Sequence, residues 1–288
     1  MSHDILAGRA VARIGYGAMQ LRHLAGDAAA ARALLRLAID LGADHIDTAQ
    51  FYGGGFVNQT IATVVRPDDR VLIATKIGAD PDPAARVPIR LAQRPAQLRA
   101  SVEANLAGLG LERLPLVYLR RPDLGPGATA EGDQIVDLDD QLAVLTALRD
   151  EGKIGALGLS GVGLDGLRRA MPAGIACVQN AYSLVSRELE AMLTFCRENG
   201  VAWVPFFPLG GAAPGWPKVT DRPEVIEIAA RLGATPSQLA LAWLLGHGPN
   251  IFLIPGTANA VHLRQNLGAG AITLDARAKA ELDGIAAG

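Results

Sequence analysis

Short runs of apolar residues alternate with longer amphipathic segments along nearly the whole chain. The short runs are rich in Val, Ile, Leu and Ala, as buried strands are. The longer segments repeat apolar residues every three or four positions, which is the spacing of helices that cover a core. The predicted strands are residues 13–18, 44–47, 71–76, 114–119, 154–159, 175–179, 202–206 and 251–254, and predicted helices between them include 28–41, 97–109, 138–149 and 188–199.

Local signals agree with these helices. Proline stands at the expected first turn in Arg94-Pro95 and in Thr235-Pro236, where its missing N–H costs little. Glycine follows helical runs at positions 42, 110, 152 and 200, where a left-handed residue commonly ends a helix. We therefore expect regular strand–helix units.

Eight strands with helices between them predict a parallel sheet that is buried on both faces. No Ser- or Pro-rich linker divides the chain. We therefore expect a single α/β domain over residues 1–288, a (β/α)8 TIM barrel with its active site at the C-terminal ends of the strands. A rival is a Rossmann fold, because residues 161–166 read G-x-G-x-x-G after a strand. The next strand ends in Gln179-Asn180 rather than in an acid for a ribose, which favours an ordinary glycine-rich turn.

Residues with useful chemistry stand at or just past the ends of the predicted strands, where barrel enzymes place their active sites. They are Asp47, Lys76, Arg120, Ser160, Gln179 and Phe206. Asp47 and Lys76, together with Tyr52 shortly after Asp47, have the chemistry of a tuned proton donor. An ammonium near a phenol oxygen favours the phenolate, and a carboxylate holds that ammonium charged and oriented. The sequence therefore predicts a catalytic group of Asp47, Tyr52 and Lys76.

Composition narrows the range of functions. A net charge of −2 gives no basic surface for nucleic acid or an anionic membrane, and no apolar run reaches the ~20 residues of a membrane span. The first residues lack a signal-peptide pattern, so we expect a cytoplasmic protein. Cys177 and Cys196 are expected to be reduced and buried. We expect no metal site, because no cluster of His, Cys or carboxylates has metal-ligand spacing.

The motifs resemble those of the aldo-keto reductase family from the first strand to the last helices. The matching segments are residues 14–19, 46–53, 75–76, 158–160, 179–180, 208–210, 254–257 and 265–266. Residues 15–21, 204–211, 234–236, 239–245, 249–251 and 254–257 resemble in particular the bacterial pyridoxal reductase branch of that family.

The resemblance implies NAD(P)H-dependent carbonyl reduction. Tyr52 would protonate the carbonyl oxygen, Lys76 would lower the pKa of Tyr52, and Asp47 would pair with Lys76. Arg120 takes the place of the family's catalytic histidine. An arginine is always charged and longer than a histidine. It would bind the carbonyl oxygen or an anionic group such as a ring oxygen beside an aldehyde, and its charge would depress the Tyr52 pKa further. The alternative is a structural ion pair with a carboxylate.

The resemblance also implies a cofactor site, with NADPH favoured and NAD possible. Its residues would be Gly17, Ala18, Met19, Ser160, Gln179, Phe206, Leu209, Gly210, Gly256, Thr257, His262, Arg264, Gln265 and Asn266. Phe206 would stack on the nicotinamide, and Thr257 with His262 or Arg264 would meet a ribose phosphate. Gln265 stands where the family usually has a glutamate, and Gly161 stands where many relatives have an asparagine.

The leading substrate implied is pyridoxal, reduced to pyridoxine. Met19, Arg120 and Trp216 would line its site, with simple loop packing as the alternative for Trp216. The rivals are a reductase of another aldehyde, ketone or sugar, and a catalytically weak NADP(H)-binding regulatory subunit. We expect a monomer or weak homo-oligomer, a hydrogen-bonded core histidine at His45, and a mouth loop over residues 77–94.

Overall fold

A computed structural model describes residues 3–82, 84, 89–124, 129–211 and 216–285 of the chain. Its main sheet has seven parallel strands in the order β11-β10-β9-β8-β5-β4-β3. These are β3 (Tyr16–Gly17), β4 (His45–Asp47), β5 (Leu72–Ile77), β8 (Leu114–Arg120), β9 (Ile154–Ser160), β10 (Ile175–Gln179) and β11 (Ala202–Trp203). Strand order follows chain order, so the order reversal of a Rossmann sheet is not present in the described strands.

The predicted eighth strand, residues 251–254, closes the barrel through isolated bridges only. Phe252 N donates to Trp203 O at 2.9 Å, and Leu253 N donates to Arg13 O at 2.8 Å. The segment thus divides its hydrogen bonds between its two neighbours and pairs with each at a single position. The (β/α)8 barrel is confirmed, with this last strand reduced to two bridges.

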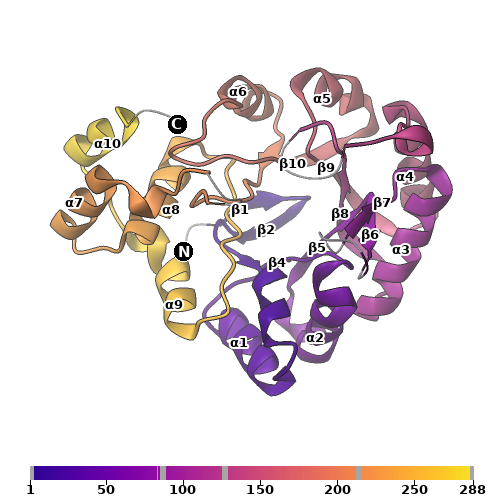
Figure 1. Ribbon diagram of the computed structural model, residues 1–288, viewed down its shortest axis with the longest axis horizontal. Coiled ribbons are helices and arrows are strands. Elements are labelled where there is room, and N and C mark those ends of the chain that lie inside the picture. The colour runs from indigo at the N-terminus through magenta and orange to yellow at the C-terminus, as the bar shows by residue number, and fades with distance from the viewer. Residues whose placement is uncertain (1–2, 83, 85–88, 125–128, 212–215, 286–288) are drawn as a thin grey trace.

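Helices ring the strands (Figure 1). They are α1 (Ala28–Asp40), α2 (Phe56–Val64), α3 (Pro95–Leu109), α4 (Leu138–Asp150), α5 (Leu164–Ala170), α6 (Glu190–Glu198), α7 (Pro223–Arg231), α8 (Pro236–His247), α9 (Ala260–Gly268) and α10 (Ala276–Asp283). The predicted first-turn prolines begin α3 and α8. Thr235 and Gln238 form a reciprocal cap at the start of α8, and Gly110 ends α3 with φ +65°.

Two antiparallel hairpins had no counterpart among the predicted strands. One joins β1 (His3–Leu6) to β2 (Arg9–Ala12), and the other joins β6 (Ala79–Pro81) to β7 (Ile89–Leu91). Three of the four residues of β1 are exposed, so its sequence lacks the alternation that marks a half-buried strand. The second hairpin lies within the expected mouth loop, of which residues 83 and 85–88 lie outside the described part.

The interior of the barrel forms its own apolar cluster. It joins Leu6 and Val11 of the first hairpin to strand residues such as Leu72, Tyr118 and Phe252. Ala12 N also donates to Asp44 Oδ1 at 2.8 Å, just before β4 begins. The β1–β2 hairpin therefore covers the amino end of the barrel and leaves the carboxyl end for chemistry.

The two cysteines and two of the tryptophans are buried, as the sequence predicts. Cys177 and Cys196 are both free and buried. The predicted core residues Trp203 and Trp243 are 0% and 2% exposed. Among the helices of the described residues, none is both long and apolar enough to cross a membrane.

Candidate active site

Asp47 lies at the centre of a buried polar group inside the barrel. Lys76 Nζ donates to Asp47 Oδ1 and, at 3.0 Å, to Thr48 O. Gln179 Nε2 donates to Asp47 Oδ2 at 2.8 Å. Lys76 comes from the neighbouring strand β5, whereas Gln179 comes from β10 on the far side of the sheet order. The Asp47 carboxylate therefore points into the barrel, where it binds both partners.

Tyr52 enters the same group from the turn that follows β4. It begins a short 3-10 segment, η2 (Tyr52–Gly55), in which Gly53 and Gly54 adopt φ +60° and +61°. Such angles favour glycine, and the turn they form brings the tyrosine back over the strand ends. Lys76 Nζ lies 5.1 Å from the centroid of the Tyr52 ring. The structure thus brings the predicted Asp47, Tyr52 and Lys76 together.

Burial dominates the electrostatics of this group. It raises the pKa of Tyr52, and the opposing charges of Lys76 and Arg120 do not overcome it. For Lys76, burial is the largest effect and lowers the pKa, but Asp47 and Tyr52 together outweigh it and the net shift is upward. The result is a neutral phenol beside a charged ammonium. The expected lowering of the Tyr52 pKa by Lys76 is therefore one contribution rather than the net direction.

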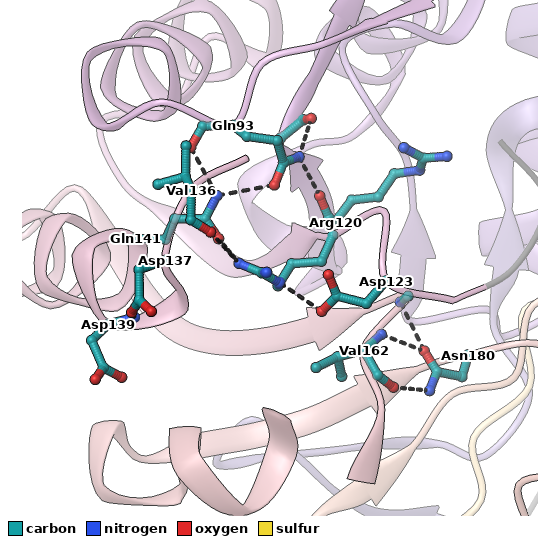
Figure 2. Close-up of polar contacts among 12 residues, drawn as sticks. Gln93, Arg120, Asp123, Val136, Asp137, Asp139, Gln141, Val162 and Asn180 are labelled. Carbon is teal, nitrogen blue, oxygen red and sulfur yellow. Dashed lines mark hydrogen bonds and ion pairs between the residues drawn. The ribbon is translucent and has the colours of Figure 1, made fainter. Parts of the chain in front are cut away.

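Arg120 ends β8 and faces Ser160 of β9 in the strand register. Its Nη1 is buried and has no hydrogen-bond partner among the described residues. Burial lowers the pKa of Arg120, while the nearby Tyr52 acts in the opposite direction. Figure 2 shows the Arg120 side chain extending away from the polar cluster that surrounds its main chain. The structural ion pair considered from the sequence is absent from the described part of the chain.

A second polar network, which the sequence pattern did not reveal, supports these strand ends from behind. Thr48 Oγ1 donates to Asn58 Oδ1 at 2.7 Å, and Thr75 Oγ1 donates to Asn105 Oδ1 at 2.5 Å. Asn58 Nδ2 joins the two by donating to Asn105 Oδ1 at 3.1 Å. Both asparagines are 0% exposed. The available signal was their position on the apolar stripes of α2 and α3.

The predicted glycines at the closure of the barrel allow two backbone segments to meet. A Cβ on Gly17 would lie 2.4 Å from Ile254 O, and one on Gly256 would lie 2.6 Å from Gly17 O. Ala18 and Met19 follow directly in the 3-10 segment η1 (Ala18–Leu24). These residues therefore line the carboxyl end of the barrel at the junction of its first and last strands.

Ser160 and Gln179 are both buried at the ends of their strands. The next residue, Asn180, holds the glycine-rich turn, because its Oδ1 accepts from Gly161 N at 2.8 Å and its Nδ2 donates to Val162 O at 2.8 Å (Figure 2). Gly161 has φ +67°, and a Cβ there would lie 2.3 Å from Arg121 O. This close approach leaves no room for a side chain at position 161 in this chain.

Aromatic side chains lie in a row after β11. Phe206 and Phe207 meet edge to face with 5.0 Å between ring centroids, and Phe207 lies 6.4 Å from Trp216. Phe207 has φ +54°, a costly conformation for a bulky residue. Trp216 therefore packs within its loop against an aromatic neighbour of Phe206. In the same loop, a Cβ on Gly210 would lie 2.2 Å from Pro217 O, which keeps the adjacent Leu209 segment close to that backbone.

The remaining predicted cofactor residues lie on or just before α9. The side chain of Asn259 caps this helix by accepting from Val261 N at 2.8 Å, and Thr257 Oγ1 accepts from Asn259 N at 3.1 Å. Along the helix, His262 and Arg264 are exposed, Gln265 is half-buried and Asn266 is buried. In the part of the chain that the structure describes, no three His, Cys, Asp or Glu side chains form a metal-binding group.

One sequence expectation is wrong in part. His45 is buried, as predicted, with 1% exposure. However, neither of its ring nitrogens has a hydrogen-bond partner within the described residues. Its ring packs against Gly15 and meets Phe252 edge to face at 6.2 Å. The nearest carboxylate oxygen, Asp44 Oδ1, lies 4.0 Å from His45 Nδ1, which is beyond hydrogen-bond distance.

Comparisons with known proteins agree with this geometry. The model of the "Aldo/keto reductase family" matches residues 13–287. The chain is 41% identical to pyridoxine 4-dehydrogenase of Escherichia coli (strain K12), over 97% of this chain and 96% of that protein. It is 29% identical to probable aldo-keto reductase 1 of Glycine max, over 93% of this chain and 83% of that protein.

A solved structure agrees as well. It is an aldo-keto reductase from Klebsiella pneumoniae in complex with NADPH, with a TM-score of 0.80, 26% identity, and coverage of 98% of this chain and 95% of that one. The oxidoreductase class predicted from the sequence is confirmed by the family match. The chain belongs to the aldo/keto reductase family.

Proposed function

We propose that this protein is an NADPH-dependent reductase of small aldehydes, with pyridoxal as the leading substrate and pyridoxine as its product. The observation that carries the proposal is the group of Asp47, Lys76 and Tyr52 at the carboxyl end of the barrel. The E. coli relative named pyridoxine 4-dehydrogenase supports the choice of substrate. The Klebsiella pneumoniae structure in complex with NADPH supports the choice of cofactor.

Each member of the group has a distinct task in this reaction. Bound NADPH supplies the hydride that reaches the carbonyl carbon. The Tyr52 hydroxyl gives its proton to the carbonyl oxygen, so that the product is an alcohol and the tyrosine becomes a phenolate. Lys76 stabilises that phenolate, and Asp47 keeps Lys76 charged. Because Tyr52 starts as a neutral phenol, it holds the proton that this step requires.

The chain offers a site that fits the cofactor. The close backbone approaches at Gly17 and Gly256 bring together the ends of the first and last strands, and the approach at Gly210 closes the loop after β11. The residues proposed to hold the cofactor lie on these segments. We place the nicotinamide against Phe206, with Ser160 and Gln179 as partners of its carboxamide. The phosphates and adenosine would meet Ala18, Met19, Leu209, Gly210, Gly256, Thr257, His262, Arg264, Gln265 and Asn266. Trp216 and Met19 would flank the substrate.

The test is NADPH oxidation followed by absorbance, with pyridoxal and a panel of small aldehydes, ketones and sugars. The proposal expects the fastest turnover with pyridoxal and loss of that turnover in Tyr52→Phe. Turnover that favours another carbonyl compound would keep the mechanism and reject the substrate. Tight NADPH binding without turnover on any compound would reject the enzyme and favour an NADP(H)-binding regulatory subunit.

A further inference from the structure

Two adjacent arginines at the end of β8 differ in how their guanidinium groups are used. Arg121 Nε donates to Asp123 Oδ2 at 2.7 Å, and its Nη1 donates to Gln141 Oε1 at 2.5 Å. Arg120 has no such partners among the described residues, and its Nη1 is buried and unpaired. Arg120 as a whole is only part-buried, but a buried nitrogen of a charged group that lacks a partner is costly. The unpaired Arg120 nitrogen therefore indicates either a poorly positioned side chain or a group that binds a ligand.

The main chain of Arg120 is held firmly, which argues against a poorly positioned side chain. Gln93 Nε2 donates to Arg120 O at 2.9 Å and to Gly78 O at 2.6 Å (Figure 2). Gln141 Nε2 in turn donates to Gln93 Oε1 at 2.9 Å. Gly78, at φ +94°, leaves no space for a Cβ, which would lie 2.4 Å from Arg120 O. The polar cluster thus fixes where the Arg120 side chain begins.

Of the three charged side chains assigned to the site, Lys76 and Arg120 are positive and Asp47 is negative. Asp47 pairs with Lys76, so these two charges offset each other. The guanidinium of Arg120 then remains without a counter-charge beside the Tyr52 phenol. A site with this balance of charges favours a substrate that brings one negative charge.

We propose that Arg120 selects substrates in which an anionic oxygen lies beside the reacting carbonyl oxygen, so that one planar guanidinium faces both. This inference rests on the proposed carbonyl reduction at Tyr52. Since the carbonyl oxygen must reach the Tyr52 hydroxyl, a group bound by the neighbouring arginine must be close to it on the substrate. Two chemical sources fit this description, a phenolate oxygen ortho to an aromatic aldehyde and the carboxylate of a 2-oxo acid.

The experiment compares 2-hydroxybenzaldehyde with 2-methoxybenzaldehyde, which has the same ring and carbonyl but cannot ionise. Phenylglyoxylate and its neutral methyl ester form the second pair. All are assayed at a pH at which the ring hydroxyl is ionised. The wild-type protein should prefer the anionic member of at least one pair by about tenfold or more in kcat/KM, as a charge-assisted contact predicts. The pair with the larger ratio identifies the source of the anion.

Variants connect the preference to the guanidinium. Arg120→Met should reduce the ratio to within about twofold of one, and Arg120→Lys should keep part of it because the charge remains. Arg113→Met is the matched control, because it removes an exposed guanidinium just before the opposite end of the same strand. It should keep the wild-type ratio. A ratio near one in the wild-type protein, or an unchanged ratio in Arg120→Met, would overturn the inference.

A binding measurement separates this inference from the proposed function. Calorimetry on the protein with bound NADP+ would compare 2-nitrophenolate with 2-nitroanisole, neither of which is an aldehyde. The phenolate should bind the wild-type protein about tenfold more tightly than it binds Arg120→Met, while 2-nitroanisole should not distinguish the two. Equal binding of the phenolate would overturn the inference. Failure to reduce any neutral aldehyde would instead count against the proposed function.

Discussion

The two ends of the barrel accommodate buried polar groups in different ways, and strand β4 includes an example of each. Asp47 at the carboxyl end is 4% exposed and binds Lys76 and Gln179. His45, two residues earlier on the same face, is 1% exposed and binds nothing among the described residues. Burial lowers the pKa of His45 to about 4. The carboxyl end therefore pairs the charges of Asp47 and Lys76, whereas the amino end accepts a polar ring by keeping it neutral.

The difference indicates where function resides. At the carboxyl end, charged groups are retained although replacing a buried pair by apolar residues often costs no stability. Arg120 even has an unpaired nitrogen. At the amino end, the first hairpin covers an apolar interior that has no use for charge. We therefore expect changes at the carboxyl end to affect catalysis and changes near His45 to affect stability.

The largest effect is expected from Tyr52→Phe. Removal of a general acid should lower kcat by about 10³-fold, within the usual range for such groups. The free energy of unfolding should change little, because the hydroxyl is lost and the ring remains. Steady-state kinetics, NADPH titration and thermal unfolding would measure the three quantities. Wild-type turnover in the variant would contradict the assignment of Tyr52 as proton donor.

The second effect is acid destabilisation through His45. Its pKa is about 4 in the folded protein and 6.5 in the unfolded chain, so the unfolded chain binds more protons between these values. Stability is therefore full above pH 6.5 and falls as the pH decreases toward 4, by up to about 3 kcal/mol. Urea unfolding over this range would measure it. His45→Leu should remove this part of the pH dependence, and an unchanged profile would assign the acid sensitivity to other groups.

Much of the fold could be predicted because its signals are local. The start of α3 at Pro95 and its end before Gly110 follow from single residues with strong backbone preferences. The strand ends that position Asp47 and Lys76 follow from short apolar runs. The β1–β2 hairpin could not be predicted, because most of its side chains are exposed and show no alternation.

The site was predictable at its centre and less so in its surroundings. Asp47 and Lys76 lie at the ends of neighbouring strands, so the barrel geometry brings them together, and the glycine turn after β4 adds Tyr52. Asn58 and Asn105 interact across two helices, and helical periodicity treats a polar residue as outward-facing by default. The unpaired state of His45 depends on what surrounds it from distant strands, such as Phe252. Contacts between residues that are far apart in the sequence cannot be predicted from local sequence patterns.

The third effect tests the cluster that holds Arg120. Gln93→Met removes the side-chain donor to Arg120 O and one of the two donors to Gly78 O, which still accepts from Ala92 N. This loss should cost about 2 kcal/mol of stability. It should also raise KM for the preferred aldehyde several-fold with a smaller change in kcat, because Arg120 is displaced and Tyr52 is not. Gln59→Met, at an exposed position on α2, is the matched control. Equal KM values in both variants would show that Gln93 does not position Arg120.

The smallest effect is expected at the amino end. His45→Leu at a pH above 6.5 removes two buried ring nitrogens that have no partner in the described structure, and unsatisfied groups of this kind are costly. The tight contact with Gly15 offsets part of the gain, so we expect a net stabilisation of about 1 kcal/mol. Urea unfolding would measure it, with kcat as a control that should stay at the wild-type value. A clear loss of stability would mean that the imidazole has a partner, such as an internal water, and that both ends of the barrel satisfy their buried polar groups.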